Sequence, residues 1–179
     1  PICLPTPGSV REIVRRHLDQ LGRPAREVVR AAAVLGRACD PDVLATTAGL
    51  DAHTARNHVA ELIQRHVVEE AGHQLRFVHD SLRELAYGEL SAEARRRLHQ
   101  RAALAVEARH GRDPDFAQRF AQLAYHFERA GDAVRTVAYL ERAADHALDT
   151  AGYGDARAML LRLLDLGRHE EPSRRARWQ

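Results

Sequence analysis

The sequence predicts a mainly α-helical protein that contains one small β-hairpin. Three observations lead to this fold class. Apolar residues recur at helical spacing along most of the 179-residue chain. Residues that favour helix starts alternate with glycines that favour helix ends. Between residues 67 and 78 the helical spacing gives way to two short segments rich in β-branched and aromatic side chains.

Four helices are expected before residue 66, each bounded by capping residues. The expected starts are Ser9, which forms a capping box with Glu12, then Pro24, Asp40-Pro41 and Asp51. The expected ends of the first three are Gly22, Leu35 just before Gly36, and Gly49. Strands at 67–71 and 74–78 follow, with Gly72-His73 as their turn.

Helices followed by a small hairpin are the element order of a winged-helix domain. We therefore expect residues 1–90 to form a winged-helix domain, which ends with a helix from Asp80 to Leu90. In this reading Asp80 is the N-cap of that last helix, because its carboxylate can accept hydrogen bonds from the first free amides.

Residues 91–179 are expected to form antiparallel helical hairpins joined by short loops. Expected helices run from Ser91 to near Gly111 and from Asp113-Pro114 to Ala130; a third follows the break at Gly131-Asp132 and ends at about Thr150, and a last one follows Gly152–Gly154 and ends near Leu166. The pattern around the Gly131-Asp132 break resembles a tetratricopeptide (TPR) repeat: Leu123, Ala124, Phe127, Leu140 and Ala143. A second set follows after 20 residues instead of 34: Tyr153, Ala156, Leu160 and Leu163. A TPR-like arm and a plain antiparallel bundle both fit.

Composition limits the classes of protein that this chain can be. All 27 basic residues are arginine and the net charge is +2, so total charge gives no reason to expect nucleic acid or anionic membrane as a partner. The two cysteines cannot form a disulfide framework, and no apolar run or leader suggests a membrane. We expect a cytoplasmic protein and, since residue 1 is not methionine, a piece of a larger one.

Motifs for catalysis and metal binding are missing from the sequence. A P-loop needs a lysine, and the chain has none. His53 and His58 are five residues apart on one expected helix and point to different faces, which disfavours a metal site. Cys39 precedes a helix start and is expected to be an inert packing residue. We therefore expect no catalytic residue, no metal and no enzymatic activity of the chain itself.

Charge also disfavours DNA binding by the expected winged helix. Residues 40–80 carry three arginines and seven acidic residues, a net charge of −4, with Glu69-Glu70 in the hairpin. A surface in a DNA groove must neutralise phosphates. Thr54, Arg56, Asn57 and His58 could still read base edges. A DNA-binding regulator with a helical dimerisation domain is therefore the alternative function.

Residues 76–87, Arg-Phe-Val-His-Asp-Ser-Leu-Arg-Glu-Leu-Ala-Tyr, resemble the Met-His-Asp segment of STAND-class signalling NTPases. Val78 stands where the family has methionine. Four further stretches resemble parts of the same family: Leu4-Pro-Thr-Pro7, Ala31-Ala-Ala-Val-Leu-Gly36, Arg95-Arg-Arg-Leu-His99 and Tyr125-His-Phe-Glu-Arg-Ala-Gly-Asp132. In that family the segment closes the hairpin of a winged helix that follows a P-loop ATPase domain, and bacterial members continue into a helical-repeat arm.

The resemblance implies a regulatory role in a parent ATPase. It makes His79 the residue that contacts the phosphate of ADP, held between the winged helix and the P-loop domain. ADP and ATP are then cofactors of the parent protein only, and the P-loop domain is an intramolecular partner. A protein or small-molecule signal would bind the helical arm, and no membrane partner is expected. An all-helical adaptor without a nucleotide role is a further alternative.

Overall fold

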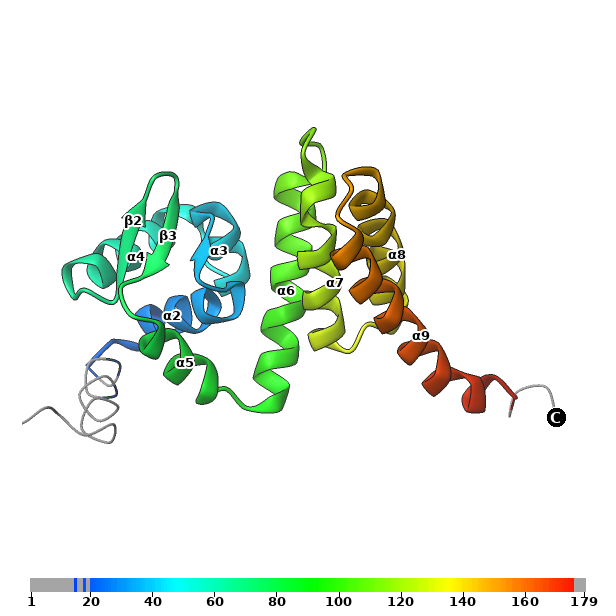
Figure 1. The fold of residues 1–179 in the computed structure, drawn as a ribbon. Helices are drawn as coiled ribbons and strands as arrows, with labels where there is room; N and C mark the ends of the chain where they lie inside the picture. The colour runs from blue at the N-terminus through cyan, green and yellow to red at the C-terminus, as the bar shows by residue number, and fades with distance from the viewer. Residues whose placement is uncertain (1–14, 16–17, 19, 176–179) are drawn as a thin grey trace, which may run out of the picture. The chain divides into compact units, whose positions relative to one another are not determined.

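The computed structural model describes residues 15, 18 and 20–175 of the chain, and over these the protein is mainly helical with one small antiparallel sheet (Figure 1). The chain divides into two compact units, Pro1–Arg109 and His110–Gln179. The expected boundary after residue 90 lies one helix earlier. Most of the first expected helix, including Ser9 and Glu12, lies outside the described residues, as do Cys3 and the Leu4-Pro-Thr-Pro7 stretch.

Three helices form the core of the first unit. They are α2 (Arg23–Leu35), α3 (Pro41–Ala48) and α4 (Ala52–Gln64), and α2 packs against both of the others. Asp40 Oδ1 accepts a 2.7 Å hydrogen bond from the amide of Asp42, and Asp51 Oδ1 accepts from the amides of His53 and Thr54 at 3.0 Å. The predicted starts at Asp40-Pro41 and Asp51 are confirmed, because both carboxylates cap their helices as the sequence indicates.

The sheet of the first unit has three strands, β1 (Ala38–Cys39), β2 (Val68–Ala71) and β3 (Gln74–Phe77), in the order β1-β3-β2. The predicted hairpin is confirmed with each strand one residue shorter, and Gly72 turns it with φ of +65°. Glu69 faces Arg76 across the hairpin, and Ala38 faces Arg76 on the other side of β3. Strand β1 was not predicted, since two residues are too few to show an alternating pattern.

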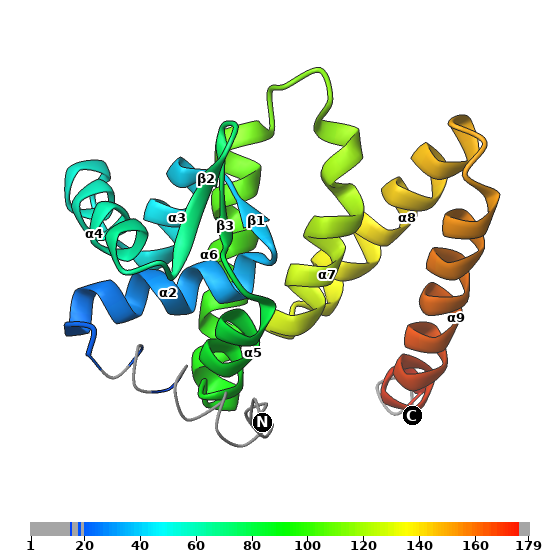
Figure 2. The ribbon, with the colours of Figure 1, turned by 60° about the vertical axis from the view of Figure 1, so that its left-hand side comes forward.

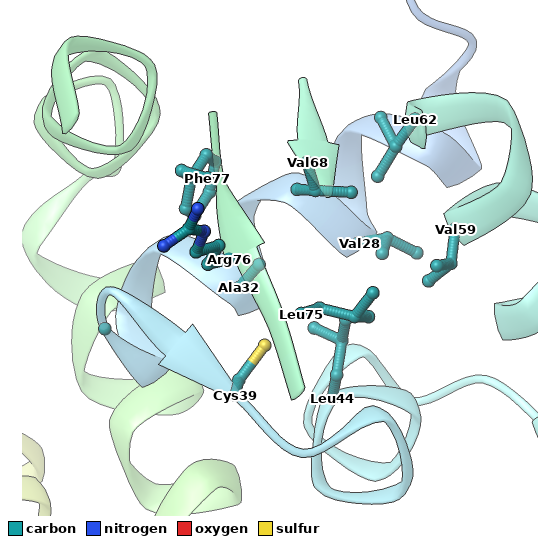
Figure 3. A pocket seen from close by; sticks show the side chains of 11 residues that line it. Val28, Ala32, Cys39, Leu44, Val59, Leu62, Val68, Leu75, Arg76 and Phe77 are labelled. Atoms are coloured by element: carbon teal, nitrogen blue, oxygen red, sulfur yellow. The ribbon is translucent and has the colours of Figure 1, made fainter. Parts of the chain in front are cut away.

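The core between helices and sheet is closely packed. Figure 3 shows Val28, Leu44, Val59 and Leu75 around a void of only about 10 Å³, room for no more than one water molecule. Cys39 lines the same void. Burial, with a smaller contribution from the charge of Asp40, raises the pKa of this thiol to about 12. The thiol is therefore protonated and unreactive near neutral pH, as the sequence led us to expect.

Two more helices complete the first unit, α5 (Asp80–Gly88) and α6 (Ala92–His110). Ser91 precedes α6, and its hydroxyl accepts a 3.2 Å hydrogen bond from the amide of Ala94, as expected of a cap. The hydroxyl of Tyr87 in α5 lies 3.0 Å from Nε2 of His99 in α6, a side chain that is fully buried. This bond joins α6 to α5 within the first unit.

The second unit contains a 3₁₀ turn, η1 (Phe116–Arg119), and the helices α7 (Phe120–Ala130), α8 (Ala133–Asp149) and α9 (Tyr153–Arg175). The three helices run in alternating directions, and α8 packs against both α7 and α9 (Figure 2). The helix start expected at Asp113-Pro114 is wrong. Asp113 instead bonds Nδ1 of His110 at 2.7 Å, and residues 111–115 form a turn. Helix α9 also continues past the expected end at Leu166.

Residues of the repeat-like pattern are buried in the second unit. The buried members of the first set are Leu123, Ala124, Phe127, Leu140 and Ala143. Phe127 stacks on Tyr139, with ring centroids 5.6 Å apart. Of the second set Ala156 is buried, whereas Tyr153 and Leu160 are exposed. None of the described helices combines the length and the apolar character that spanning a lipid bilayer demands.

Candidate functional site

His79 occupies the joint between β3 and α5. On one side Phe77 is buried, and the amide of Val78 donates a 3.2 Å hydrogen bond to the carbonyl of Val67. On the other side Leu82 is buried. Both neighbouring elements are therefore anchored in the core, while the side chain of His79 is exposed. The joint presents this imidazole from a fixed backbone.

The imidazole of His79 has no hydrogen bond or ion pair to any residue within the described ranges. His79 is the N-cap of α5, with φ of −134° and ψ of 133°, yet its side chain makes no capping hydrogen bond to the helix. An imidazole in this state can donate a hydrogen bond to an external acceptor.

Asp80 is not the N-cap that the sequence analysis predicts. It is the first residue of α5, because its own backbone is already helical and His79 holds the extended conformation before it. Its carboxylate lies 2.8 Å from a guanidinium nitrogen of Arg37. A carboxylate in the first turn still interacts favourably with the helix dipole. The carboxylate of Asp80 therefore forms an ion pair with Arg37 and does not form the expected hydrogen bonds with the first backbone amides of α5.

Arg37 is a site residue that the sequence analysis missed. It immediately precedes β1, and because Ala38 faces Arg76 the chain there runs beside the end of β3. This register carries Arg37 to the start of α5. The sequence gives only a weak indication of this position, because the short stretch between Gly36 and Asp40 belongs to neither neighbouring helix.

A second arginine lies one helical turn after His79. Arg83 Nε is buried and has no hydrogen-bond partner in the part of the chain that the structure describes. Buried polar groups are almost always paired in folded proteins. The start of α5 thus combines the exposed imidazole of its N-cap, an arginine whose Nε has no hydrogen-bond partner among the described residues, and the Arg37–Asp80 pair. These are groups suited to an anion.

The residues that could read DNA bases on α4 are engaged within their own helix. Arg56 Nε donates to the carbonyl of Ala52 at 3.0 Å, and the amide nitrogen of Asn57 lies 3.3 Å from Nε2 of His53. The Thr54 hydroxyl donates to Asp51 at 2.6 Å and holds the pKa of that carboxyl below its usual range. A charged carboxylate at the start of α4 repels phosphate.

His58 also interacts locally, with Nδ1 3.6 Å from a carboxylate oxygen of Glu61.

Over the described residues, no group of three or more His, Cys, Asp and Glu side chains is placed to hold a metal ion. Among the described residues the buried histidines are His99, His110 and His126, which lie apart from His79 in the sequence and belong to helices α6 and α7.

Comparison with known proteins adds no relative to these observations. No family model matches the sequence, and neither a curated protein nor a solved structure matches it. A function for the chain therefore rests on its own side chains and on the resemblance carried by residues 76–87.

Proposed function

We propose that this chain is a non-catalytic regulatory region of a cytoplasmic STAND-type signalling ATPase. In this proposal the first unit contains a winged-helix domain and the second is the start of a TPR-like arm. The element order supports the first assignment, since three helices are followed by a hairpin whose sheet is completed by β1. The alternating helices α7, α8 and α9 support the second.

The observation that carries the proposal is the state of His79. The segment that resembles the family's Met-His-Asp motif leaves its histidine exposed and unpaired among the described residues, between two anchored elements. A phosphate of ADP held by an adjoining P-loop domain could accept a hydrogen bond from this ring. Arg37 compensates the negative charge of Asp80, which would otherwise oppose an anion at this position.

Arg83 fits the same anion. Its Nε is a buried donor without an acceptor in the described chain, so a phosphate near the start of α5 would supply one. The bound nucleotide defines the state of the parent protein, ADP the resting state and ATP the active one. In the proposed closed state the winged helix contacts the ADP held by the P-loop domain, and in the open state it has moved away so that ATP can replace ADP.

The arm would receive the signal. Helix α9 exposes Leu160, Leu161 and Leu164, apolar side chains that a protein partner would cover. The alternative, a DNA-binding regulator, is less well supported because residues 40–80 carry a net charge of −4. The upstream coding sequence distinguishes our proposal from the all-helical adaptor. A Gly-Lys-Ser/Thr loop encoded before Pro1 supports the ATPase, and its absence supports the adaptor.

The decisive experiment compares two variants of the parent protein, His79→Leu and His73→Leu. Removal of a charge-assisted hydrogen bond of roughly 1.5–3 kcal/mol should shift the closed–open equilibrium by ~10–150-fold. We expect His79→Leu to release ADP faster and to activate the protein without a signal. His73 lies in the exposed hairpin turn and is the matched control. Equal ADP release from the two variants contradicts the role of His79.

A further inference from the structure

A groove on the first unit runs along one face of α4. The helix contributes Ala52, Ala55, Arg56, Val59, Ala60 and Ile63 to its lining. Residues of α3 close one side, and Glu70 and Leu75 come from the hairpin. The groove has a volume of about 440 Å³, which is within the range of natural ligand sites. Nothing in the proposed nucleotide role uses this surface.

The shape of the groove suits a helix. Its α4 residues recur at three- and four-residue intervals, so they form one continuous stripe. From Ala52 to Ile63 the stripe is roughly 16 Å long at 1.5 Å per residue, the length of about three helical turns. The floor is apolar, since Leu75 and Ala55 are buried, and the alanines leave room for close approach. Three of the eleven lining residues, Asp42, Arg56 and Glu70, are charged, and the other eight are apolar.

Two charges of opposite sign lie at the edge of the groove, and neither has a counter-ion among the described residues. Arg56 is exposed, and its one hydrogen bond in the described chain goes to the carbonyl of Ala52 in its own helix. Glu70 is exposed and forms no ion pair with any described residue. By contrast, the neighbouring Glu69 is paired with Arg76 at 2.6 Å, and Asp42 lies 3.4 Å from Arg109.

We propose that this groove binds an amphipathic helix of another protein. The helix places its apolar face over Val59, Ala60 and Ile63, a basic residue against Glu70 and an acidic residue against Arg56. The mode is a helix laid into an apolar groove, with charges at the rim that fix its direction. A DNA duplex fits less well for two reasons. Glu70 repels phosphate, and the apolar floor of the groove does not hydrogen-bond to the charged sugar-phosphate backbone of DNA.

The test uses the full chain and labelled helical peptides of alanine and leucine in fluorescence anisotropy. Two peptides each carry one arginine and one glutamate beside the apolar face, and the positions of the two charges are exchanged between them. A third peptide carries glutamine at both positions. We expect one charged order to bind more tightly than the neutral peptide. Glu70→Arg should weaken the binding of that peptide about threefold to fivefold and leave the binding of the neutral peptide unchanged. Glu84→Arg, an exposed acid of α5, is the control of equal charge.

A second pair of variants tests the groove itself. Ala60→Trp fills it and should abolish binding of all three peptides, whereas Ala121→Trp, on an exposed position of α7, should not. Arg56→Glu, a surface change, tests the same site if the tryptophan variant fails to fold. The proposal is overturned if no peptide binds, if Ala60→Trp and Arg56→Glu both leave binding intact, or if a short DNA duplex binds instead and Arg56→Glu removes that binding.

Discussion

The guanidinium of Arg37 lies 2.8 Å from the carboxylate of Asp80, and this pair links the entrance of β1 to the first turn of α5. The contact exists because β1 pairs with β3, which brings two distant parts of the sequence together. His79 is the residue immediately before Asp80. Arg37 therefore compensates the acidic charge that directly follows, in the sequence, the imidazole that we propose as the phosphate contact.

Removal of the Arg37–Asp80 pair should cost little stability. Both side chains are largely exposed, 79% for Arg37 and 48% for Asp80, so water screens their attraction. We expect a coupling of about 0.2–1 kcal/mol in a double-mutant cycle of Arg37→Ala and Asp80→Asn, measured by urea denaturation. A coupling well above this range would mean that the pair acts as a buried structural contact and not as a local charge balance.

Tyr87→Phe should destabilise the first unit by about 1–3 kcal/mol. The substitution removes the hydroxyl that lies 3.0 Å from Nε2 of His99, and His99 is fully buried, so water cannot replace the lost partner. The free energy of unfolding in urea measures the effect. Tyr153→Phe is the control, because the side chain of Tyr153 is 69% exposed. Equal stability of both variants would show that the bond contributes nothing.

Gly131→Ala should destabilise the turn between α7 and α8. Gly131 has φ of +83°, a left-handed conformation that a side chain disfavours by about 1 kcal/mol. Gly167→Ala should have the opposite effect, since Gly167 lies inside α9 with open space around it and alanine favours helix by about 1 kcal/mol. Thermal unfolding of both variants checks the signs, and a stabilising Gly131→Ala would contradict the left-handed turn.

ADP should not bind this chain tightly by itself. The chain contains no lysine and no glycine-rich phosphate loop, so it lacks the groups that hold nucleotide phosphates in P-loop proteins. We expect calorimetric titration of the chain with ADP to show no micromolar binding. Binding at that affinity would indicate a complete nucleotide site here, and the idea of a site shared with a P-loop domain would then be wrong.

Local signals explain which helices of the first unit could be predicted. Asp40 and Asp51 cap α3 and α4 as expected, and Gly49 ends α3 with φ of +74°, because capping depends on neighbouring residues alone. The start at Asp113-Pro114 failed for a related reason. The carboxylate of Asp113 bonds the side chain of His110, three residues earlier in the chain. This bond competes with the capping hydrogen bond that the sequence predicts.

The site at α5 was predictable only in part. The resemblance of residues 76–87 proposes His79 and the strand pattern places it after a strand, and the structure adds that its side chain is exposed. Whether Asp80 or His79 is the N-cap depends on one pair of dihedral angles, which composition does not determine. The partnership of Asp80 with Arg37 depends on β1, a two-residue strand whose pairing is set by the folded sheet.

Acid should destabilise the second unit through His126. Burial lowers the pKa of this imidazole from 6.5 to about 4, so the folded state keeps it neutral while the unfolded state binds a proton below pH 6.5. Stability therefore falls as pH drops from about 6.5 to about 4, by about 3 kcal/mol in total. Urea denaturation at several pH values should show this loss in the native chain and in His73→Leu, an exposed control. In His126→Leu the loss should be absent, and an unchanged pH dependence in that variant would rule out His126 as its source.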